Sequence, residues 1–120
     1  IRRPLFVVGT ERDHVAPWRS VYKIHLLADA EITFLLTSGG HNVGIVSEPE
    51  KKRGGYRFTT RVDGEHYADP DEWTKIATVR EGSWWPEWSA WLAVRSGPPV
   101  APPAMGPALC DAPGAYVLQS

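Results

Sequence analysis

The 120-residue sequence contains a single cysteine, Cys110. One cysteine excludes an internal disulfide and fits a reducing compartment. Long apolar runs are also missing, because no stretch approaches the length of a transmembrane helix and no charged start followed by an apolar core marks an export signal. These absences predict a cytoplasmic protein without a membrane span.

An excess of charge of one sign is absent as well. The formal net charge is −1, and 42% apolar with 22% charged residues is ordinary for one small globular domain. The one basic cluster, Lys51 to Arg53, stands beside two glycines, and such a cluster is more often a solvated turn than a binding site. We therefore expect no nucleic-acid partner.

The chain also lacks a complete catalytic or metal-binding motif. Neither Gly-x-Ser-x-Gly nor Gly-x-Cys-x-Gly occurs, and Ser38, Ser47, Ser83 and Ser89 stand in no comparable context. Cys110 lies among prolines, far from any strand-to-helix turn. No two histidines or cysteines have the spacing of metal ligands, so no metal site is expected. A nucleophile cannot be assigned within this sequence.

Two apolar runs, residues 4–10 and 31–37, are rich in β-branched and aromatic residues. Such runs are typical of strands buried inside a parallel sheet. Residues 17–28 lie between them and predict a helix, because Pro17 suits a first turn and apolar residues share one face. This strand–helix–strand crossover places the carboxyl ends of both strands at one edge of the sheet. The predicted fold class is α/β.

Asp13 follows the first run and His41 follows the second. Neighbouring strands lie about 4.8 Å apart, so the two loops can meet at the edge where open α/β sheets bind ligands. Alone, Asp13 would more often cap a turn and His41 would be a solvated loop residue. Together they match the second half of a nucleophile–acid–histidine order, in which a carboxylate holds the imidazole base in one tautomer.

The next part of the chain predicts a hairpin. Residues 56–62 alternate between apolar and polar side chains, as expected for a half-buried strand. Asp63-Gly64 is a strong turn signal, and residues 65–67 would form the returning arm.

Two helices and an arm are predicted after the hairpin. One helix opens at Asp69 and holds Trp73 and Ile76. A second runs from about residue 86 to residue 95. From Pro98 onward six prolines fall within sixteen residues, which predicts an extended arm. Residues 116–118 could add a short strand at its end.

Three segments resemble motifs of the polyhydroxyalkanoate synthases. They are residues 8–18 (VGTERDHVAPW), residues 38–46 (SGGHNVGIV) and residues 82–92 (GSWWPEWSAWL). A terminal Ala-Pro-Gly-x-Tyr-Val, residues 112–117, is also similar to this family. The resemblance runs nearly end to end with the motifs in the same order, and it favours an active-site role for Asp13 and His41.

The resemblance implies that residues 1–97 are the C-terminal portion of an α/β-hydrolase catalytic domain and residues 98–120 a proline-rich arm. In this family a cysteine thiolate attacks the thioester of a 3-hydroxyacyl-coenzyme A and lengthens a polyester. The cysteine would lie upstream of Ile1, so the chain alone is expected to be inactive. His41 would take the thiol proton. Asp13 would orient the imidazole or activate the 3-hydroxyl, and the sequence leaves both roles open.

The resemblance also implies no metal or redox cofactor, a homodimer, and a location on cytoplasmic granules. The remaining part of the catalytic domain would be a partner of this chain. Weak candidates for substrate contact are His14, Trp18 and Asn42. Asn42 replaces an aliphatic residue of well-known family members, so subclass and acyl length stay open.

Tryptophans are concentrated near the second late helix. Trp88, Trp91 and Leu92 would form its buried face, which is the commoner use of large aromatic residues. Alternatively, Trp84 and Trp85 would belong to an exposed surface for a subunit, an acyl chain or the polyester.

Two other functions remain open. One is a fragment of a serine α/β-hydrolase esterase, and the other is a noncatalytic aromatic-rich module that binds a partner or a granule. The residue at the centre of the upstream elbow would distinguish cysteine acyl transfer from serine hydrolysis. The sequence enters a buried-type strand almost at Ile1, so we expect it to be an excerpt that would associate or repack in isolation.

Overall fold

A computed structural model describes residues 2–50 and 53–119 of the chain. Its centre is a four-stranded mixed sheet with the strand order β1-β2-β3-β4. The strands are β1 (Leu5–Thr10), β2 (Ile32–Thr37), β3 (Gly55–Arg61) and β4 (Thr78–Glu81). β1 pairs with β2 in parallel, and the other two pairs are antiparallel. The predicted α/β class and the parallel pairing of the first two strands are confirmed.

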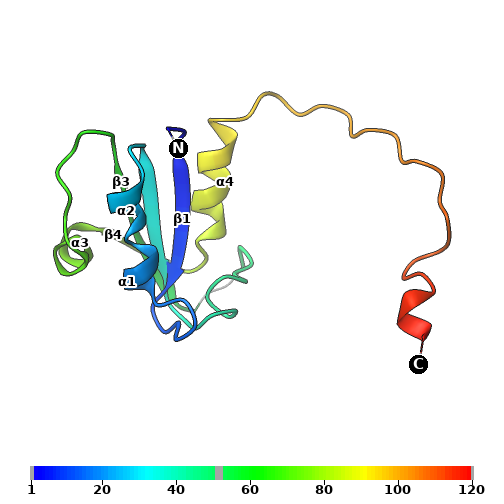
Figure 1. Ribbon diagram of the computed structural model, residues 1–120, viewed down its shortest axis with the longest axis horizontal. Coiled ribbons are helices and arrows are strands. Elements are labelled where there is room, and N and C mark those ends of the chain that lie inside the picture. The colour runs from blue at the N-terminus through cyan, green and yellow to red at the C-terminus, as the bar shows by residue number, and fades with distance from the viewer. Residues whose placement is uncertain (1, 51–52, 120) are drawn as a thin grey trace.

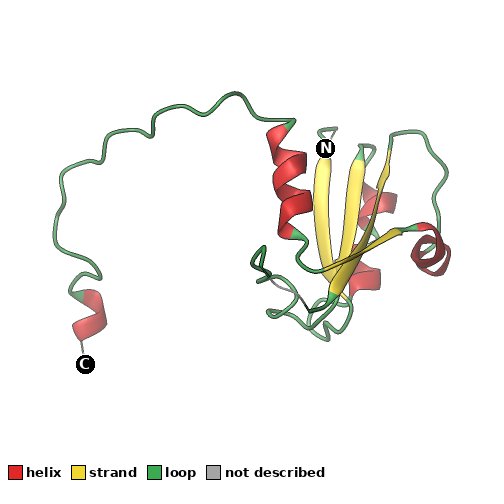
Figure 2. Ribbon diagram, turned by 180° about the vertical axis from the view of Figure 1, so that it is seen from behind, coloured by secondary structure: helices red, strands yellow, loops and turns green. Residues whose placement is uncertain are grey.

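Helices lie on both faces of this sheet (Figures 1 and 2). The short helices α1 (Trp18–Val21) and α2 (Ile24–Leu27) cover one face, and α4 (Trp85–Ala93) covers the other. Helix α3 (Pro70–Ile76) follows β3, and the 3-10 helix η1 (Tyr116–Leu118) lies near the end of the chain. The sheet is therefore covered by helices on both faces. All six residues of the central strand β2 are buried.

Alternation along β2 divides the core into two clusters, because successive strand side chains point to opposite faces. Phe34 belongs to the α1–α2–α3 side, together with Tyr22 and Trp73. Leu35 belongs to the α4 side, together with Tyr56 and Trp84. The apolar residues of β2 thus contribute to the core on both faces of the sheet.

The predicted helix over residues 17–28 is wrong in its continuity, since the chain forms two short helices there. The backbone N–H groups of Lys23, His25 and Leu26 donate to the third preceding residue, at 3.3, 3.1 and 2.9 Å. This tighter winding rotates the later residues relative to an α-helix. As a result Leu26 and Leu27 are exposed, whereas His25 is buried.

The predicted hairpin is also wrong in its second arm. β3 pairs with β4, and residues 65–67 form no strand. The turn after β3 is closed locally, because Val62 N–H donates to the Glu65 carboxylate at 3.0 Å and Glu65 N–H donates to the Val62 carbonyl at 3.2 Å. Of the basic cluster, Lys51 and Lys52 lie outside the described residues, and Arg53 is exposed.

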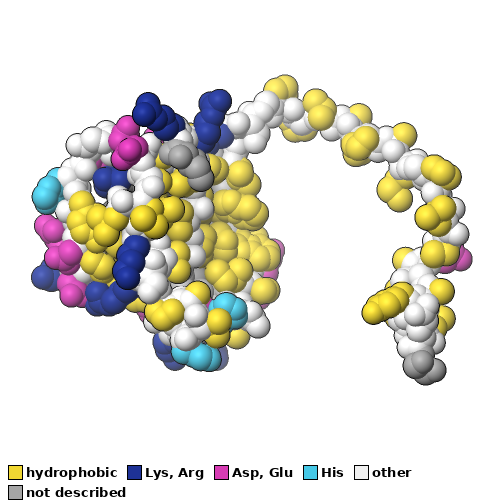
Figure 3. Space-filling model, in the orientation of Figure 1, with side chains coloured by type: hydrophobic (Ala, Val, Ile, Leu, Met, Phe, Trp, Pro, Cys, Tyr) yellow, Lys and Arg dark blue, Asp and Glu magenta, His cyan; other side chains and the backbone are white. Residues whose placement is uncertain are grey.

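The proline-rich segment forms an arm that leaves the body of the molecule (Figures 1 and 3). Residues 97–115 contain no helix or strand, and Val100, Met105 and Leu109 are 85–97% exposed. Residues 116–118 form a 3-10 helix, so the expected terminal strand is wrong. Within the described residues, no helix is long and apolar enough to cross a bilayer.

Candidate active site at the carboxyl ends of β1 and β2

The structure brings Asp13 and His41 into direct contact. The register pairs Thr10 with Thr37, so β1 and β2 end at the same level and their loops start side by side. Glu11 N–H donates to the Thr37 carbonyl at 3.0 Å, which extends the backbone pairing into the loops. His41 Nδ1 and Asp13 Oδ2 lie 2.8 Å apart. The geometry expected of a paired acid and histidine is present, while their catalytic use stays a prediction.

Both carboxylate oxygens of Asp13 accept hydrogen bonds. Oδ1 accepts the backbone N–H groups of Val15 and Ala16, both at 2.9 Å. Oδ2 accepts the Thr10 hydroxyl at 3.2 Å in addition to the His41 ring. The Ala16 N–H and then the His41 hydrogen bond hold the pKa of Asp13 well below its usual range. Asp13 is therefore a carboxylate at neutral pH.

The ionised state of Asp13 fixes the tautomer of His41. A carboxylate only accepts hydrogen bonds, so the ring nitrogen that faces it, Nδ1, has to carry the proton. In the neutral imidazole Nε2 then has a free lone pair, which is what a general base needs. The His41 side chain is 50% exposed and that of Asp13 only 7%. The Asp13 carboxylate is therefore largely buried, whereas the His41 ring is accessible from solvent.

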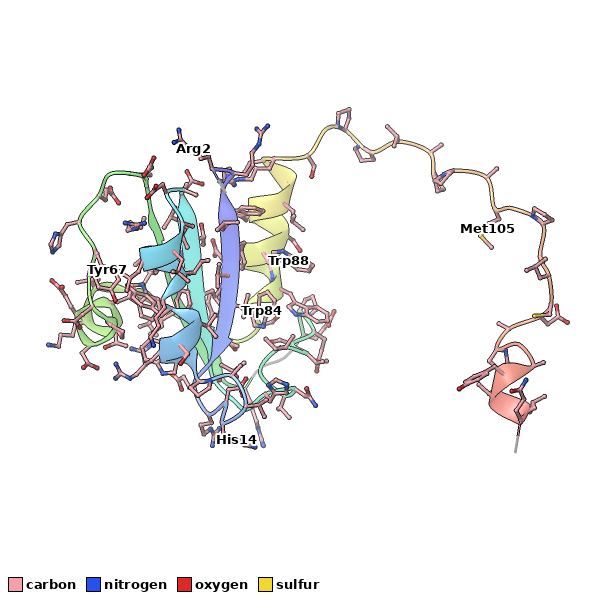
Figure 4. All side chains as sticks on the ribbon, in the orientation of Figure 1. Arg2, His14, Tyr67, Trp84, Trp88 and Met105 are labelled. Carbon is pink, nitrogen blue, oxygen red and sulfur yellow. The ribbon has the colours of Figure 1, made fainter. Side chains whose placement is uncertain are left out.

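Two of the three weak substrate candidates lie at the loops and one does not. His14 is exposed at this end of the molecule (Figure 4), and Asn42 is exposed next to His41. Trp18 instead packs into the core, with its ring 6.0 Å from Trp73 and 6.4 Å from Phe34. The structure therefore gives Trp18 a packing role on the α1 face of the sheet.

The expected distribution of exposed tryptophans is wrong in two positions. Trp84 is only 6% exposed and belongs to the core, so it forms no exposed aromatic surface. Trp88 is 40% exposed, although it was expected on the buried face of its helix. Trp85 is half-buried. Trp88 lies one helical turn after Trp84, and their ring centroids are 6.0 Å apart, but Trp88 is the more exposed of the two.

Some contributors to the site carry no signal in the sequence. Thr10 ends an apolar strand, and its hydroxyl contacts Asp13 only because the loop folds back over it. A cavity of about 220 Å³ beside the same loops is lined by Glu11, Ser38 and residues of β3 and β4, and β4 was not predicted. Among the residues that the structure describes, no group of three or more His, Cys, Asp or Glu side chains could hold a metal ion.

Sequence comparison gives matches along almost the whole chain. Poly(3-hydroxyalkanoate) polymerase 2 of Ectopseudomonas oleovorans is 37% identical over 94% of this chain and 20% of its own length. The poly(3-hydroxyalkanoate) polymerase subunit PhaC of Cupriavidus necator is 34% identical over 95% of this chain and 20% of its own. The PhaC subunit of Rhizobium etli is 32% identical over 99% and 19%. No family model matches the chain.

The chain is a homologue of the poly(3-hydroxyalkanoate) polymerases. It spans about a fifth of the length of the curated polymerases that it matches. The sequence resemblance noted in three motifs is thereby confirmed, and Asp13 and His41 lie in the portion that the polymerases share with it.

Proposed function

We propose that this chain is the part of a polyhydroxyalkanoate synthase that supplies the acid and the histidine of a Cys-Asp-His triad. The observation that carries the proposal is the 2.8 Å contact between Asp13 Oδ2 and His41 Nδ1 at the level ends of two parallel strands. The parallel pair, with helices on both faces, supports an α/β-hydrolase fold. Residues 1–97 would belong to its catalytic domain and residues 98–120 to a C-terminal arm.

In this proposal the nucleophile is a cysteine upstream of Ile1. His41 Nε2 takes the thiol proton, and the thiolate attacks the thioester carbonyl of a 3-hydroxyacyl-coenzyme A. The carbon–sulfur bond to coenzyme A breaks, and the leaving thiolate receives the proton from His41. The 3-hydroxyl of a second unit then attacks the acyl group bound to the enzyme cysteine. The ester bond of the polymer forms, the carbon–sulfur bond to the cysteine breaks, and the hydroxyl proton passes through His41 to the cysteine thiolate.

The hydrogen bonds of Asp13 favour one of its two expected roles. A carboxylate offers about four lone-pair positions, and Asp13 accepts from four donors while its side chain is 7% exposed. A substrate hydroxyl would have to displace one of these donors. We therefore assign Asp13 to orienting His41, and His41 to activating both the thiol and the 3-hydroxyl.

The remaining parts of the proposal concern the whole enzyme. The homologous polymerases support a coenzyme A thioester as substrate and a polyester as product. That the reaction needs no metal or redox cofactor is part of the proposal. A homodimer, a position on polyester granules and a cytoplasmic location belong to the same proposal. On its own, without an upstream nucleophile, the chain would be inactive.

The test is coenzyme A release from 3-hydroxybutyryl-coenzyme A by the full-length protein. We expect His41→Gln to lower kcat on the order of 10³-fold or more, and Asp13→Asn to lower it about 10²- to 10⁴-fold because the wrong tautomer becomes accessible. His66→Gln is the matched control, since His66 is exposed in the segment after β3, outside the loops that carry Asp13 and His41, and should retain activity.

Three results would contradict the proposal in different ways. Full turnover by His41→Gln would support a noncatalytic module. A serine in place of the upstream cysteine, with hydrolysis of simple esters and no polymer, would support an esterase. A larger loss in His14→Gln than in His41→Gln would mean that the base has been assigned to the wrong histidine.

A further inference from the structure

Three residues at the start of α4 hold the backbone of the histidine loop, residues 38–47. Trp84 Nε1 donates to the Gly44 carbonyl at 3.0 Å, and Trp85 Nε1 donates to the Ile45 carbonyl at 3.0 Å. The Ser83 hydroxyl donates to the Ser47 carbonyl. Residues 83–85 therefore bind three backbone carbonyls in the second half of the loop that carries His41.

These contacts are anchored in the core. Trp84 is 6% exposed, stacks on Phe6 with ring centroids 6.4 Å apart, and packs with Leu35 and Tyr56. Figure 4 shows Trp84 at the end of α4 nearest the loops that follow β1 and β2. A buried indole N–H needs an acceptor, and a ring fixed by packing offers its proton in one direction only. The Gly44 carbonyl is thus fixed relative to the sheet.

On its other side, the histidine loop contacts Thr10, the residue whose hydroxyl binds Asp13. A Cβ atom at Gly44 would lie 2.6 Å from Thr10 Cγ2, so the loop backbone touches the Thr10 methyl group. The hydroxyl of the same Thr10 donates to Asp13 Oδ2. Gly44 N–H also donates to the Gly40 carbonyl at 3.0 Å, next to His41. The loop is held between α4 and the end of β1, with Asp13 and His41 at its margin.

We propose that Trp84 and Trp85 are positioning residues for the Asp13–His41 pair. Their indole N–H groups fix the histidine loop so that His41 keeps Nδ1 on Asp13 and Nε2 toward the nucleophile. The activity part of this inference rests on the proposed function. It gives the tryptophan-rich segment, residues 82–92, a role in the active site that needs no contact with substrate.

The test replaces each tryptophan by phenylalanine in the full-length protein, which keeps an aromatic ring and removes the donor. Misplacing a catalytic group by about 1 Å can cost on the order of 10²-fold in rate. We expect Trp85→Phe, Trp84→Phe and the double variant to lower kcat about 10- to 100-fold, with a smaller effect on KM. Trp91→Phe is the matched control, since its indole nitrogen is buried and meets no acceptor in the described part of the chain. It should stay within about twofold.

Two measurements separate positioning from a general loss of stability. Histidine-ring ¹⁵N NMR should show a hydrogen-bonded Nδ1–H for His41 in the wild type and a weakened or exchange-broadened signal in the Trp84 and Trp85 variants. Amide hydrogen exchange over residues 39–47 should accelerate in those variants and not in Trp91→Phe. If Trp84→Phe does not fold, Trp85→Phe carries the test, because Trp85 is only half-buried.

The outcomes distinguish this inference from the proposed function. If His41→Gln keeps full turnover while the tryptophan variants still loosen the loop, the proposed function is wrong and the positioning of the loop stands. If His41 is essential but the ring signal, the loop exchange and kcat of the tryptophan variants match those of Trp91→Phe, the positioning role is wrong.

Discussion

His25 is a buried histidine whose ring nitrogens meet no partner among residues 2–50 and 53–119. It is 6% exposed, and its ring centroid lies 4.5 Å from that of Tyr22. Burial, followed by the charge of Arg61, lowers the pKa of His25 to about 4. His25 is therefore neutral at pH 7 and lies outside the candidate active site.

This environment predicts a loss of stability in mild acid. The unfolded state binds the proton near pH 6.5 and the folded state only near pH 4, so the stability present above pH 6.5 falls as the pH drops from 6.5 to 4. We expect His25→Leu to remove this part of the pH dependence, which amounts to roughly 2–3 kcal/mol. Urea unfolding of the full-length protein at pH 7 and pH 4.5 measures it.

The exposed His14 provides the control for this prediction. His14→Leu should leave the difference between the two pH values as it is in the wild type. An equal pH dependence in His25→Leu and the wild type would mean that the His25 ring reaches solvent or an acceptor in the full-length protein.

For single residues, sequence motifs identified the candidate side chains of the site but not the groups that bind them. Asp13 and His41 each follow an apolar strand and sit in a family motif, so their meeting could be predicted. Asp13 also accepts hydrogen bonds from Thr10 and from the backbone N–H groups of Val15 and Ala16. These contacts depend on the conformation of the loop, which the residue types alone do not predict. For the same reason Trp84 was assigned to a surface, because its acceptor at Gly44 lies 40 residues away.

Among the elements, α3 is attached to the sheet mainly by Trp73. This side chain is 2% exposed, contacts Phe34 at a centroid distance of 5.1 Å, and donates from Nε1 to Thr59 Oγ1 at 2.8 Å. Ile76 of the same helix is 63% exposed. One face of α3 therefore depends on a single large residue.

We expect Trp73→Ala to lower the free energy of unfolding by about 3–5 kcal/mol, because the removed ring leaves a cavity between α3 and β2. Trp73→Phe should cost less, since the ring stays and only the hydrogen bond to Thr59 is lost. Ile76→Ala is the matched control and should change stability within about 0.5 kcal/mol. Chemical unfolding followed by circular dichroism ranks the three variants. A cost for Ile76→Ala equal to that of Trp73→Ala would contradict this packing.

An element could be predicted where the hydrophobicity of its residues matches their burial in the fold. Four of the six residues of β2 are large apolar residues, and all six are buried, so its pattern and its position agree. β4 is the polar segment Thr78–Glu81, exposed along its length, and only the neighbouring β3 makes it a strand. The break between α1 and α2 has no proline or glycine to announce it, and the expected face of the single helix was therefore misplaced.

In the molecule as a whole, the sheet and its helices form the body and the arm stands apart from it. β1 is an edge strand of this sheet, and apolar side chains lie exposed along α4 and along the arm (Figure 3). The sequence indicated the arm through its prolines, which prevent helix and central strand alike. It could not indicate where the arm lies, because the described arm residues have no regular structure until η1.

An experimental structure of the full-length protein tests the central claim most directly, by the distance from His41 Nε2 to the nearest cysteine sulfur. The account predicts a cysteine Sγ about 3.5 Å from Nε2, with Nδ1 still on Asp13, because a base has to lie within hydrogen-bond reach of the proton it removes. A structure in which Nε2 faces no thiol, or in which Asp13 and His41 have separated, would contradict it.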